Sequence, residues 1–211
     1  TVPVNANLPT TLEMIDGEEH LVGRGTVDMK GAVAIALKLA GELVDPAVDV
    51  TWIFYDHEEV AAELNGLGRI ARNRPDLMVG DFAIIGEPSN STVEGGCNGT
   101  ARIDISLKGV RAHSARAWMG ENAIHAAAPV LAILAAYEPE QHEVDGLVYR
   151  ECLNAVGISG GVAGNVIPDA ATVTVNFRFA PDRSADQAID YLRDVFDGFD
   201  FEVTDLAGGA R

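Results

Sequence analysis

The sequence predicts an α/β protein built in two parts. In residues 28–89, helical patterns alternate with continuous apolar runs, which is typical of a sheet covered by helices. From residue 101 onward, strands with alternating polar and apolar residues dominate, and the predicted order is β-α-β-β-α-β. Glycines cluster at residues 95–99, between the two patterns, so we place the boundary of the two parts there.

Four segments make up the predicted first part. DMKGAVAIALKLAGEL (28–43) has apolar residues spaced by three and four, which predicts a helix. The runs VDVTWIFYD (48–56) and DFAIIGEPS (81–89) are apolar without alternation, which predicts strands buried on both faces. Between them, AAELNGLGRIARN (61–73) is predicted to be helical, although its glycines weaken the pattern.

The second part is predicted to be a ferredoxin-like split β-α-β-β-α-β unit. Its strands are predicted at residues 101–110, 153–164, 171–181 and 199–206, and its helices at 121–137 and 184–196. Ser184 with Gln187 forms a capping-box pattern at the start of the second helix. Pro129 has to lie early in the first helix or kink it.

The composition argues against several classes of partner. A formal net charge of −17 over 211 residues disfavours nucleic acid, because neutralising phosphates requires clustered Lys and Arg. There is no apolar run of about 18 residues, so no membrane span is expected. Cys97 and Cys152 have no spacing typical of a disulfide framework or a zinc site, which favours a reducing cytoplasm.

Carboxylates occur where strands or loops of the first part meet helices. Asp28 lies at the start of a predicted helix, at a position where a dinucleotide fingerprint requires glycine. Glu58 and Glu59 follow one predicted strand, and Glu87 follows the next. Because ligands of open α/β sheets bind at the carboxyl ends of strands, these acids are expected to share a cleft. A phosphate there would meet like charges, so a metal site is the better prediction. The alternative is an N-cap at Asp28 and a solvated turn at Glu58–Glu59.

These segments resemble a known enzyme family. GRGTVDMKG, DHEE and IIGEPS resemble motifs of the di-zinc amidohydrolases and metallopeptidases, which include aminoacylases and carboxypeptidase G-type enzymes. GVRAHSARAWMGENAI and GNVIPDAATVTVNFRF resemble segments of that family's lid domain. The combination of GEPS, GCNGT and NVIPD is similar to that of succinyl-diaminopimelate desuccinylase. The resemblance implies a partial zinc-peptidase-like catalytic domain (1–98), an inserted lid and dimerisation domain (99–207) and a return toward the catalytic domain (208–211).

The resemblance also implies an activity and a metal centre. The expected reaction is hydrolysis of an N-acyl amide bond, with N-succinyl-LL-2,6-diaminopimelate as substrate and two Zn²⁺ or Co²⁺ ions per subunit of the complete enzyme. Asp28 is implied to bridge the two ions, with Glu59 on one and Glu87 on the other. Glu58 is implied to be the general base, which takes a proton from the water between the metals and passes it to the leaving amine. The Asp28–Met29 peptide bond is expected to be cis.

In the lid, the resemblance implies three substrate-binding residues. His113 is expected to reach the active site of the other subunit of a homodimer and to stabilise the oxyanion there. Asn165 and Arg178 are expected to hold carboxylate or carbonyl groups of the substrate. The alternative for Arg178 is an exposed arginine on the sheet surface. The helix at 121–137 is too apolar to face water, so we expect two lids to pair through it and an edge strand.

Two features depart from the family pattern. His57 stands where the family has the Asp of Asp-Glu-Glu. Two histidine ligands are also absent: one is expected in an H-x-D motif just before Thr1-Val2-Pro3, and the other after the lid. The sequence is therefore interpreted as a central piece of the enzyme, inactive by itself. Three further histidines match no motif and are taken as structural or surface residues: His20, His125 and His142.

Two other functions remain open at this point. Acetylornithine deacetylase and other N-acyl-amino-acid amidohydrolases share all of this chemistry, and only recognition of the substrate side chain would distinguish them. A non-catalytic dimerisation module with vestigial acids is an alternative of a different class. The intact Glu58–Glu59 pair argues against that second alternative.

Overall fold

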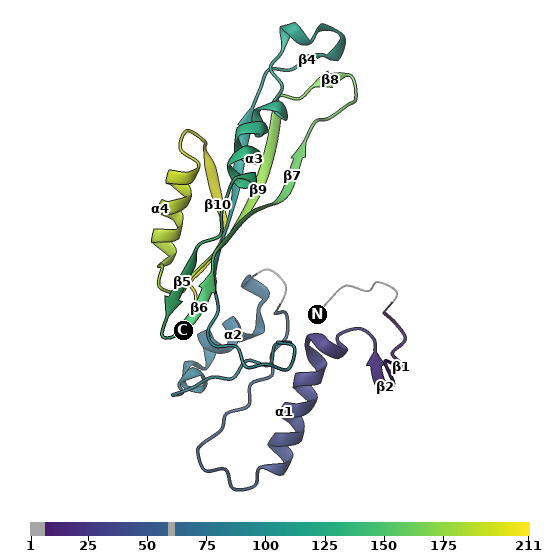
Figure 1. Cartoon of the computed structure of the whole chain (residues 1–211), viewed down its shortest axis with the longest axis vertical. Coiled ribbons are helices and arrows are strands. Elements are labelled where there is room, and N and C mark those ends of the chain that lie inside the picture. Colours follow the sequence, from purple (N-terminus) through teal and green to yellow (C-terminus); the bar gives the residue numbers. More distant parts are fainter. Residues whose placement is uncertain (1–6, 59–61) are drawn as a thin grey trace. The chain divides into compact units, whose positions relative to one another are not determined.

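The computed structural model describes residues 7–58 and 62–211 and divides into two compact units, Thr1–Val93 and Glu94–Arg211 (Figure 1). The predicted boundary between residues 98 and 99 lies a few residues further along the chain than this division. Each unit has its own secondary structure.

The first unit consists of one hairpin and several helices. β1 (Thr11–Ile15) pairs antiparallel with β2 (Glu18–Val22), and both turn residues between them, Asp16 and Gly17, have positive φ. An Asp-Gly pair of this kind is the strongest short-range hairpin signal in a sequence. The helical segments are a π-helical turn (Thr26–Lys30), α1 (Gly31–Glu42), a 3₁₀ turn (Ala62–Leu64), α2 (Gly66–Asn73) and a second 3₁₀ turn (Pro75–Met78).

Both predicted helices of this unit begin later than expected. α1 begins at Gly31 rather than at residue 28, because Asp28 and Met29 have non-helical backbone angles. α2 begins at Gly66, because the Asn65 side chain accepts a hydrogen bond from the Gly68 N–H at 3.1 Å and so caps the helix there. Of the earlier part of the predicted helix, residue 61 lies outside the described residues.

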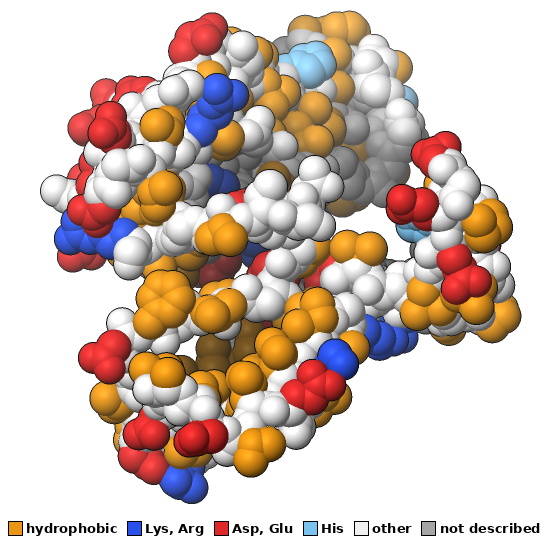
Figure 2. Space-filling model, turned by 60° about the horizontal axis from the view of Figure 1, so that its bottom comes forward, with side chains coloured by type: hydrophobic (Ala, Val, Ile, Leu, Met, Phe, Trp, Pro, Cys, Tyr) orange, Lys and Arg blue, Asp and Glu red, His pale blue; other side chains and the backbone are white. Residues whose placement is uncertain are grey.

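The two strands predicted for the first unit are wrong. Residues 48–56 and 81–89 belong to no β-ladder, and side chains such as Phe82 (85% exposed) and Ile84 (87% exposed) are open to solvent. Figure 2, which turns the bottom of Figure 1 toward the reader, shows apolar side chains widely exposed at the surface. A strand requires a hydrogen-bonded neighbour, and no segment among the described residues pairs with either run.

The second unit is the ferredoxin-like fold that the sequence predicts. Its antiparallel sheet has the strand order β10-β3-β9-β7, and two helices cover one face (Figure 1). The strands are β3 (Gly99–Lys108), β7 (Cys152–Gly160), β9 (Ala170–Phe179) and β10 (Phe201–Ala207), and the helices are α3 (Ala128–Ala135) and α4 (Ala185–Val195). The helices alternate with strand pairs along the chain, so the predicted β-α-β-β-α-β order is confirmed.

The core of this unit lies between the sheet and its helices. Along β3, Ala101, Ile103 and Ile105 are fully buried, whereas the alternate side chains lie on the opposite face. Val130 of α3 and Leu192 of α4 join the same cluster. Alternation with period two therefore indicated correctly which face of the sheet is covered.

The ends of the helices follow their sequence signals. The capping box at α4 is confirmed, because the Ser184 hydroxyl accepts from the Gln187 N–H at 3.2 Å and the Gln187 side chain accepts from the Ser184 N–H at 2.8 Å. α3 begins only at Ala128, not at residue 121, and Pro129 occupies its first turn, where a missing N–H costs nothing. A 3₁₀ turn, His125–Ala127, precedes it.

Two small ladders lie at opposite ends of this unit (Figure 1). At one end, β4 (Ala112–His113) pairs with β8 (Val166–Ile167), next to a 3₁₀ segment (Ser114–Met119). At the other end, β5 (Gln141–Val144) pairs with β6 (Leu147–Arg150) around a second Asp-Gly turn, Asp145–Gly146. The first ladder carries His113, and Asn165 directly precedes β8.

Candidate active-site residues

Asp28 lies in a tight loop that leads into α1. The loop begins at Gly25, which is buried and has a φ of 72°. The Lys30 ammonium donates to the Arg24 carbonyl at 2.9 Å and the Lys30 N–H donates to the Gly25 carbonyl at 2.8 Å, so the loop closes on itself. Asp28 is half-buried at its centre, and the Asp28–Met29 peptide bond is cis, as expected.

The segment that carries Glu87 packs against this loop. A Cβ built on Gly86 would lie 2.9 Å from the Ala32 Cβ and 3.4 Å from the Met29 Cε, so the backbone there runs directly beside the start of α1. Burial raises the pKa of Tyr55, and the negative charges of Glu58 and Glu87 raise it further. Three chain segments that carry predicted acids therefore converge in the first unit.

Glu58 is exposed, as a proton-transferring carboxylate open to substrate would be. The two residues before it form their own contacts: the His57 Nδ1 lies 3.0 Å from the Asp56 carboxylate, which also accepts from Arg69 at 3.0 Å. The hydrogen bond from His57 holds the pKa of Asp56 below its ordinary value. His57 is therefore engaged by its neighbour, while Glu59 lies outside the described residues.

The donor set of the first unit suits divalent cations. Asp28 and Glu87, the two predicted ligands among the described residues, offer carboxylate oxygens from segments that pack against each other. Carboxylate oxygens are common ligands of zinc, which also favours imidazole. The chemistry of these donors therefore suits a zinc ion, and the assignment of Asp28 and Glu87 as its ligands stays a prediction.

His113 and Asn165 lie together at one end of the second unit. His113 pairs with Val166 across the β4–β8 ladder, and the Ser114 N–H donates to the Asn165 carbonyl at 2.9 Å. The His113 Nδ1 accepts a hydrogen bond from the Ala115 N–H at 3.1 Å. A neutral imidazole that accepts at Nδ1 carries its proton at Nε2, so this ring presents a hydrogen-bond donor outward, as stabilising an oxyanion requires.

Arg178 lies at the opposite end of the same sheet. It is exposed on the face away from the helices, and no hydrogen bond or ion pair joins its guanidinium to another described residue. In the β3–β9 register, Arg178 is opposite Thr100, whereas Ala170, near the His113 end, is opposite Lys108. Eight residues of extended strand span roughly 26 Å at about 3.3 Å per residue. Within one subunit, therefore, His113 and Arg178 are too far apart to bind the same small molecule.

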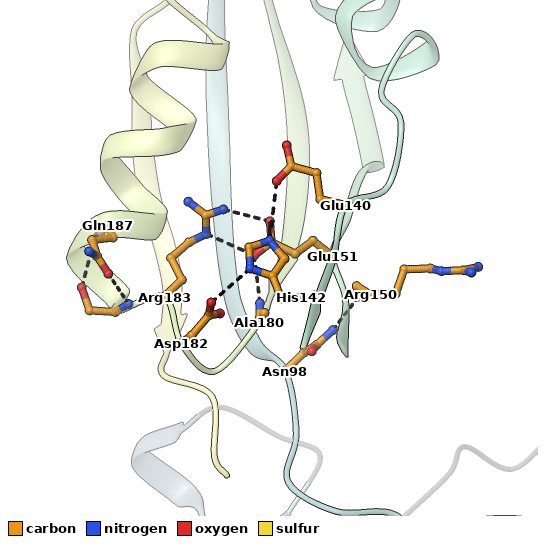
Figure 3. Close-up of polar contacts among 10 residues, drawn as sticks. Asn98, Glu140, His142, Arg150, Glu151, Ala180, Asp182, Arg183 and Gln187 are labelled. Atoms are coloured by element: carbon orange, nitrogen blue, oxygen red, sulfur yellow. Dashed lines mark hydrogen bonds and ion pairs between the residues drawn. The ribbon is translucent and has the colours of Figure 1, made fainter. Parts of the chain in front are cut away.

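One polar cluster of the second unit contains none of the residues that the sequence motifs indicate. Figure 3 shows His142 between Asp182 on one side and Glu140 and Glu151 on the other. Glu151 is fully buried and is held by Arg183. These residues come from distant parts of the sequence, so no local spacing could have indicated that they meet.

The sequence of the chain places it in a known family. Residues 96–204 match the peptidase dimerisation domain of the M20 peptidases, and the chain belongs to this family. Over the whole chain, it is 51% identical to a Mycobacterium tuberculosis protein provisionally named succinyl-diaminopimelate desuccinylase, of which it covers 59%. It is 44% identical to the succinyl-diaminopimelate desuccinylase of Corynebacterium glutamicum and covers 58% of that protein. The chain thus spans somewhat more than half the length of these relatives.

Solved structures agree with the fold. A Staphylococcus aureus tripeptidase matches 95% of this chain and 54% of its own, with a TM-score of 0.59 and 21% identity. Aminopeptidase PepT of Bacillus cereus matches 96% of this chain and 55% of its own, with a TM-score of 0.55 and 18% identity. At these identities the likeness concerns the fold alone. Among the described residues, no helix is long and apolar enough to cross a membrane.

Proposed function

We propose that this chain is the central part of a metal-dependent amidohydrolase that converts N-succinyl-LL-2,6-diaminopimelate into succinate and LL-2,6-diaminopimelate. The observation that carries the proposal is the 51% identity over the whole chain with a protein that bears this name. The predicted acids Asp28, Glu58 and Glu87 lie within the matched length. The two cysteines are free thiols, which supports a cytoplasmic location.

The acids of the first unit would have two different roles, metal binding and proton transfer. Asp28, Glu59 and Glu87 would hold two divalent ions, zinc or cobalt, which would polarise the amide carbonyl and acidify a water molecule. Glu58 would accept a proton from the attacking water and deliver it to the leaving amine nitrogen. Its exposure supports this role, because an exposed carboxylate is accessible to water and substrate for proton transfer.

The lid would complete the site through a homodimer. His113, with Nε2 as a donor, would stabilise the oxyanion, and Asn165 and Arg178 would bind substrate oxygens. Because about 26 Å of strand separates Arg178 from Ala170, at the His113 end of the sheet, a shared substrate requires that His113 and Arg178 come from different subunits. This separation supports the assignment of His113 to the partner's active site.

An uncovered apolar surface on the lid supports such a dimer. β7 is an edge strand of the sheet and contacts α3. Val156 and Ile158 on β7 are 59% and 55% exposed, and Leu131 on α3 is 39% exposed. An edge strand with free backbone groups beside exposed apolar side chains is a surface suited to pairing with a second copy.

A substrate comparison tests the proposed activity. The protein that carries this chain together with the remaining length of its relatives would be loaded with zinc or cobalt. It would then be assayed on N-succinyl-LL-2,6-diaminopimelate and on N-acetylornithine. The expected result is a kcat/KM for the succinyl substrate at least tenfold above that for acetylornithine. Preference for acetylornithine would assign the protein to the related deacylases, and hydrolysis of neither would favour a dimerisation module.

A further inference from the structure

The most densely charged group of side chains in the second unit lies at the base of the β5–β6 hairpin (Figure 3). The His142 Nδ1 is 3.1 Å from the Asp182 carboxylate, and its Nε2 is 3.5 Å from Glu140 and 3.7 Å from Glu151. The Arg183 guanidinium donates a hydrogen bond to each oxygen of Glu151, at 3.1 and 3.0 Å. The Ala180 N–H donates to the same carboxylate at 2.9 Å. The cluster therefore joins the hairpin to the loop between β9 and α4.

The same hairpin also contacts the residues by which the chain enters this unit. Tyr149, which lies opposite His142 in the hairpin, donates from its hydroxyl to the Gly95 carbonyl at 3.1 Å. The Asn98 amide donates to the Arg150 carbonyl at 2.8 Å. Gly96 has no room for a side chain, because a Cβ there would lie 2.3 Å from the Tyr149 hydroxyl oxygen. The position of the hairpin thus fixes residues 95–98.

We propose that the ion cluster around His142 is a pH-sensitive clasp, which holds the β5–β6 hairpin in place while His142 is protonated and releases it when the proton is lost. With the proton, His142 donates from both ring nitrogens to surrounding carboxylates. Without it, one nitrogen becomes an acceptor that faces a carboxylate, and an attraction becomes a repulsion. Residues 95–98 would loosen together with the hairpin.

The surroundings of His142 favour the proton. The ionisable groups in and around the cluster are Glu140 before β5, Glu151 between β6 and β7, Asp182 and Arg183 after β9, Tyr149 on β6, Tyr191 on α4 and Tyr137 after α3. Three negatively charged carboxylates and one positively charged guanidinium thus surround His142. Burial raises the pKa of Tyr137 and Tyr191, so these phenols add no charge at ordinary pH.

The direction of the pH effect follows from these contacts. The hydrogen bond to Asp182 raises the pKa of His142 above its ordinary value, against the opposing effect of burial, and the charges of Glu151 and Asp182 raise it further. A group whose pKa is higher in the folded state stabilises that state at low pH. The clasp is therefore complete below about pH 6.5 and is lost as the pH rises through the folded-state pKa of His142.

A metal ion is the competing occupant of this cluster. Glu140, His142 and Glu151 could each point one ligand atom at a common centre, since those atoms lie within 4.8 Å of one another. However, Arg183 and the Ala180 N–H already occupy the Glu151 oxygens, and Asp182 occupies the His142 Nδ1. A proton on His142 satisfies the cluster without displacing any of these contacts, so we favour the proton.

Histidine titration and amide exchange on the 211-residue chain test the clasp. NMR resonances of the His142 ring would be followed from pH 5.5 to 9.5. Amide protection factors of residues 141–150 and of Cys97, corrected for intrinsic exchange, would be measured over the same range. The expected result is titration of His142 above pH 6.5, with protection at both sites falling about tenfold for each unit by which its pKa is raised. Titration at or below the ordinary value would overturn the proposal.

Matched variants separate the clasp from a general effect of pH. His142→Gln keeps a hydrogen-bonding side chain but cannot gain a proton, so its hairpin protection should be low already at pH 6 and should not change with pH. Asp182→Asn, a milder change, should lower the pKa of His142. His125→Gln, at an exposed position, should behave as the unmodified chain does. A pH response in His142→Gln equal to that of the unmodified chain would refute the clasp. So would one equivalent of Zn²⁺ that binds the cluster and restores protection at pH 9.

Discussion

The separation of His113 from Arg178 leads to a quantitative prediction for mixed dimers. One subunit would carry Glu58→Gln and the other His113→Ala, each with its own affinity tag, in the protein that spans the length of its relatives. If His113 acts in the partner's site, one of the two sites in each mixed dimer contains both an intact Glu58 and an intact His113. Tandem-purified mixed dimers should then recover about half of the unmodified activity. Each parent homodimer should lose roughly 10²–10³-fold or more.

The reverse combination provides the control. A dimer of one unmodified subunit with one Glu58→Gln/His113→Ala double variant contains no complete site if His113 acts across the dimer, and one complete site if it acts within its own subunit. The first dimer should therefore be active and the control inactive, as measured by succinate release. Recovery in the control without recovery in the first dimer would refute the reasoning from the distance of about 26 Å along the strand.

Three further outcomes follow from particular contacts. Glu58→Gln should retain its metal content, measured by elemental analysis, while kcat falls roughly 10²–10⁴-fold; normal turnover would remove Glu58 from the role of base. Phe177→Ala, at a fully buried ring that stacks on Tyr191 with centroids 5.1 Å apart, should lower the free energy of unfolding of the second unit by about 3–5 kcal/mol in denaturant titrations. Ser184→Ala should cost about 0.5–2 kcal/mol by removing one half of the capping box, and Ser184→Asp, which can still cap, should cost less.

The second unit could be predicted from the sequence because its signals are local. Alternation along residues 101–107 reflects one covered and one open face of an antiparallel sheet, and that pattern identified the buried side chains correctly. Ser184 and Gln187 similarly placed the start of α4 within one residue. The start of α3 was placed seven residues too early, because an apolar composition predicts burial but does not say where helical hydrogen bonds begin.

The strands of the first unit could not be predicted in the same way. The apolar run at 48–56 indicates a segment suited to burial, but it does not specify which segment would pair with it. The β1–β2 hairpin was missed although Asp16-Gly17 provides a recognised turn signal, because the side chains around it are all exposed and give no clear alternation.

The candidate site was predictable only through its motifs. Glu58 and Glu87 were singled out by their positions after apolar runs, Asp28 by its position at the start of a predicted helix, and all three by the family resemblance. Their assignment as ligands and base stays a prediction. The cluster around His142 depends on contacts between residues up to 40 positions apart in the sequence. No short-range spacing reports such contacts.

The pairing of Cys97 with Ala210 has a consequence for how such a protein can be assembled and rearranged. Each residue donates its N–H to the carbonyl of the other, at 2.8 and 3.0 Å, so the first and last residues of the second unit lie side by side. A domain that carried this unit as an insertion would therefore have to bridge only the short distance between the two ends. Such an insertion would add little closure entropy. A module with adjoining ends can be removed, transplanted into another surface turn or circularly permuted without changing the distance that its host has to bridge.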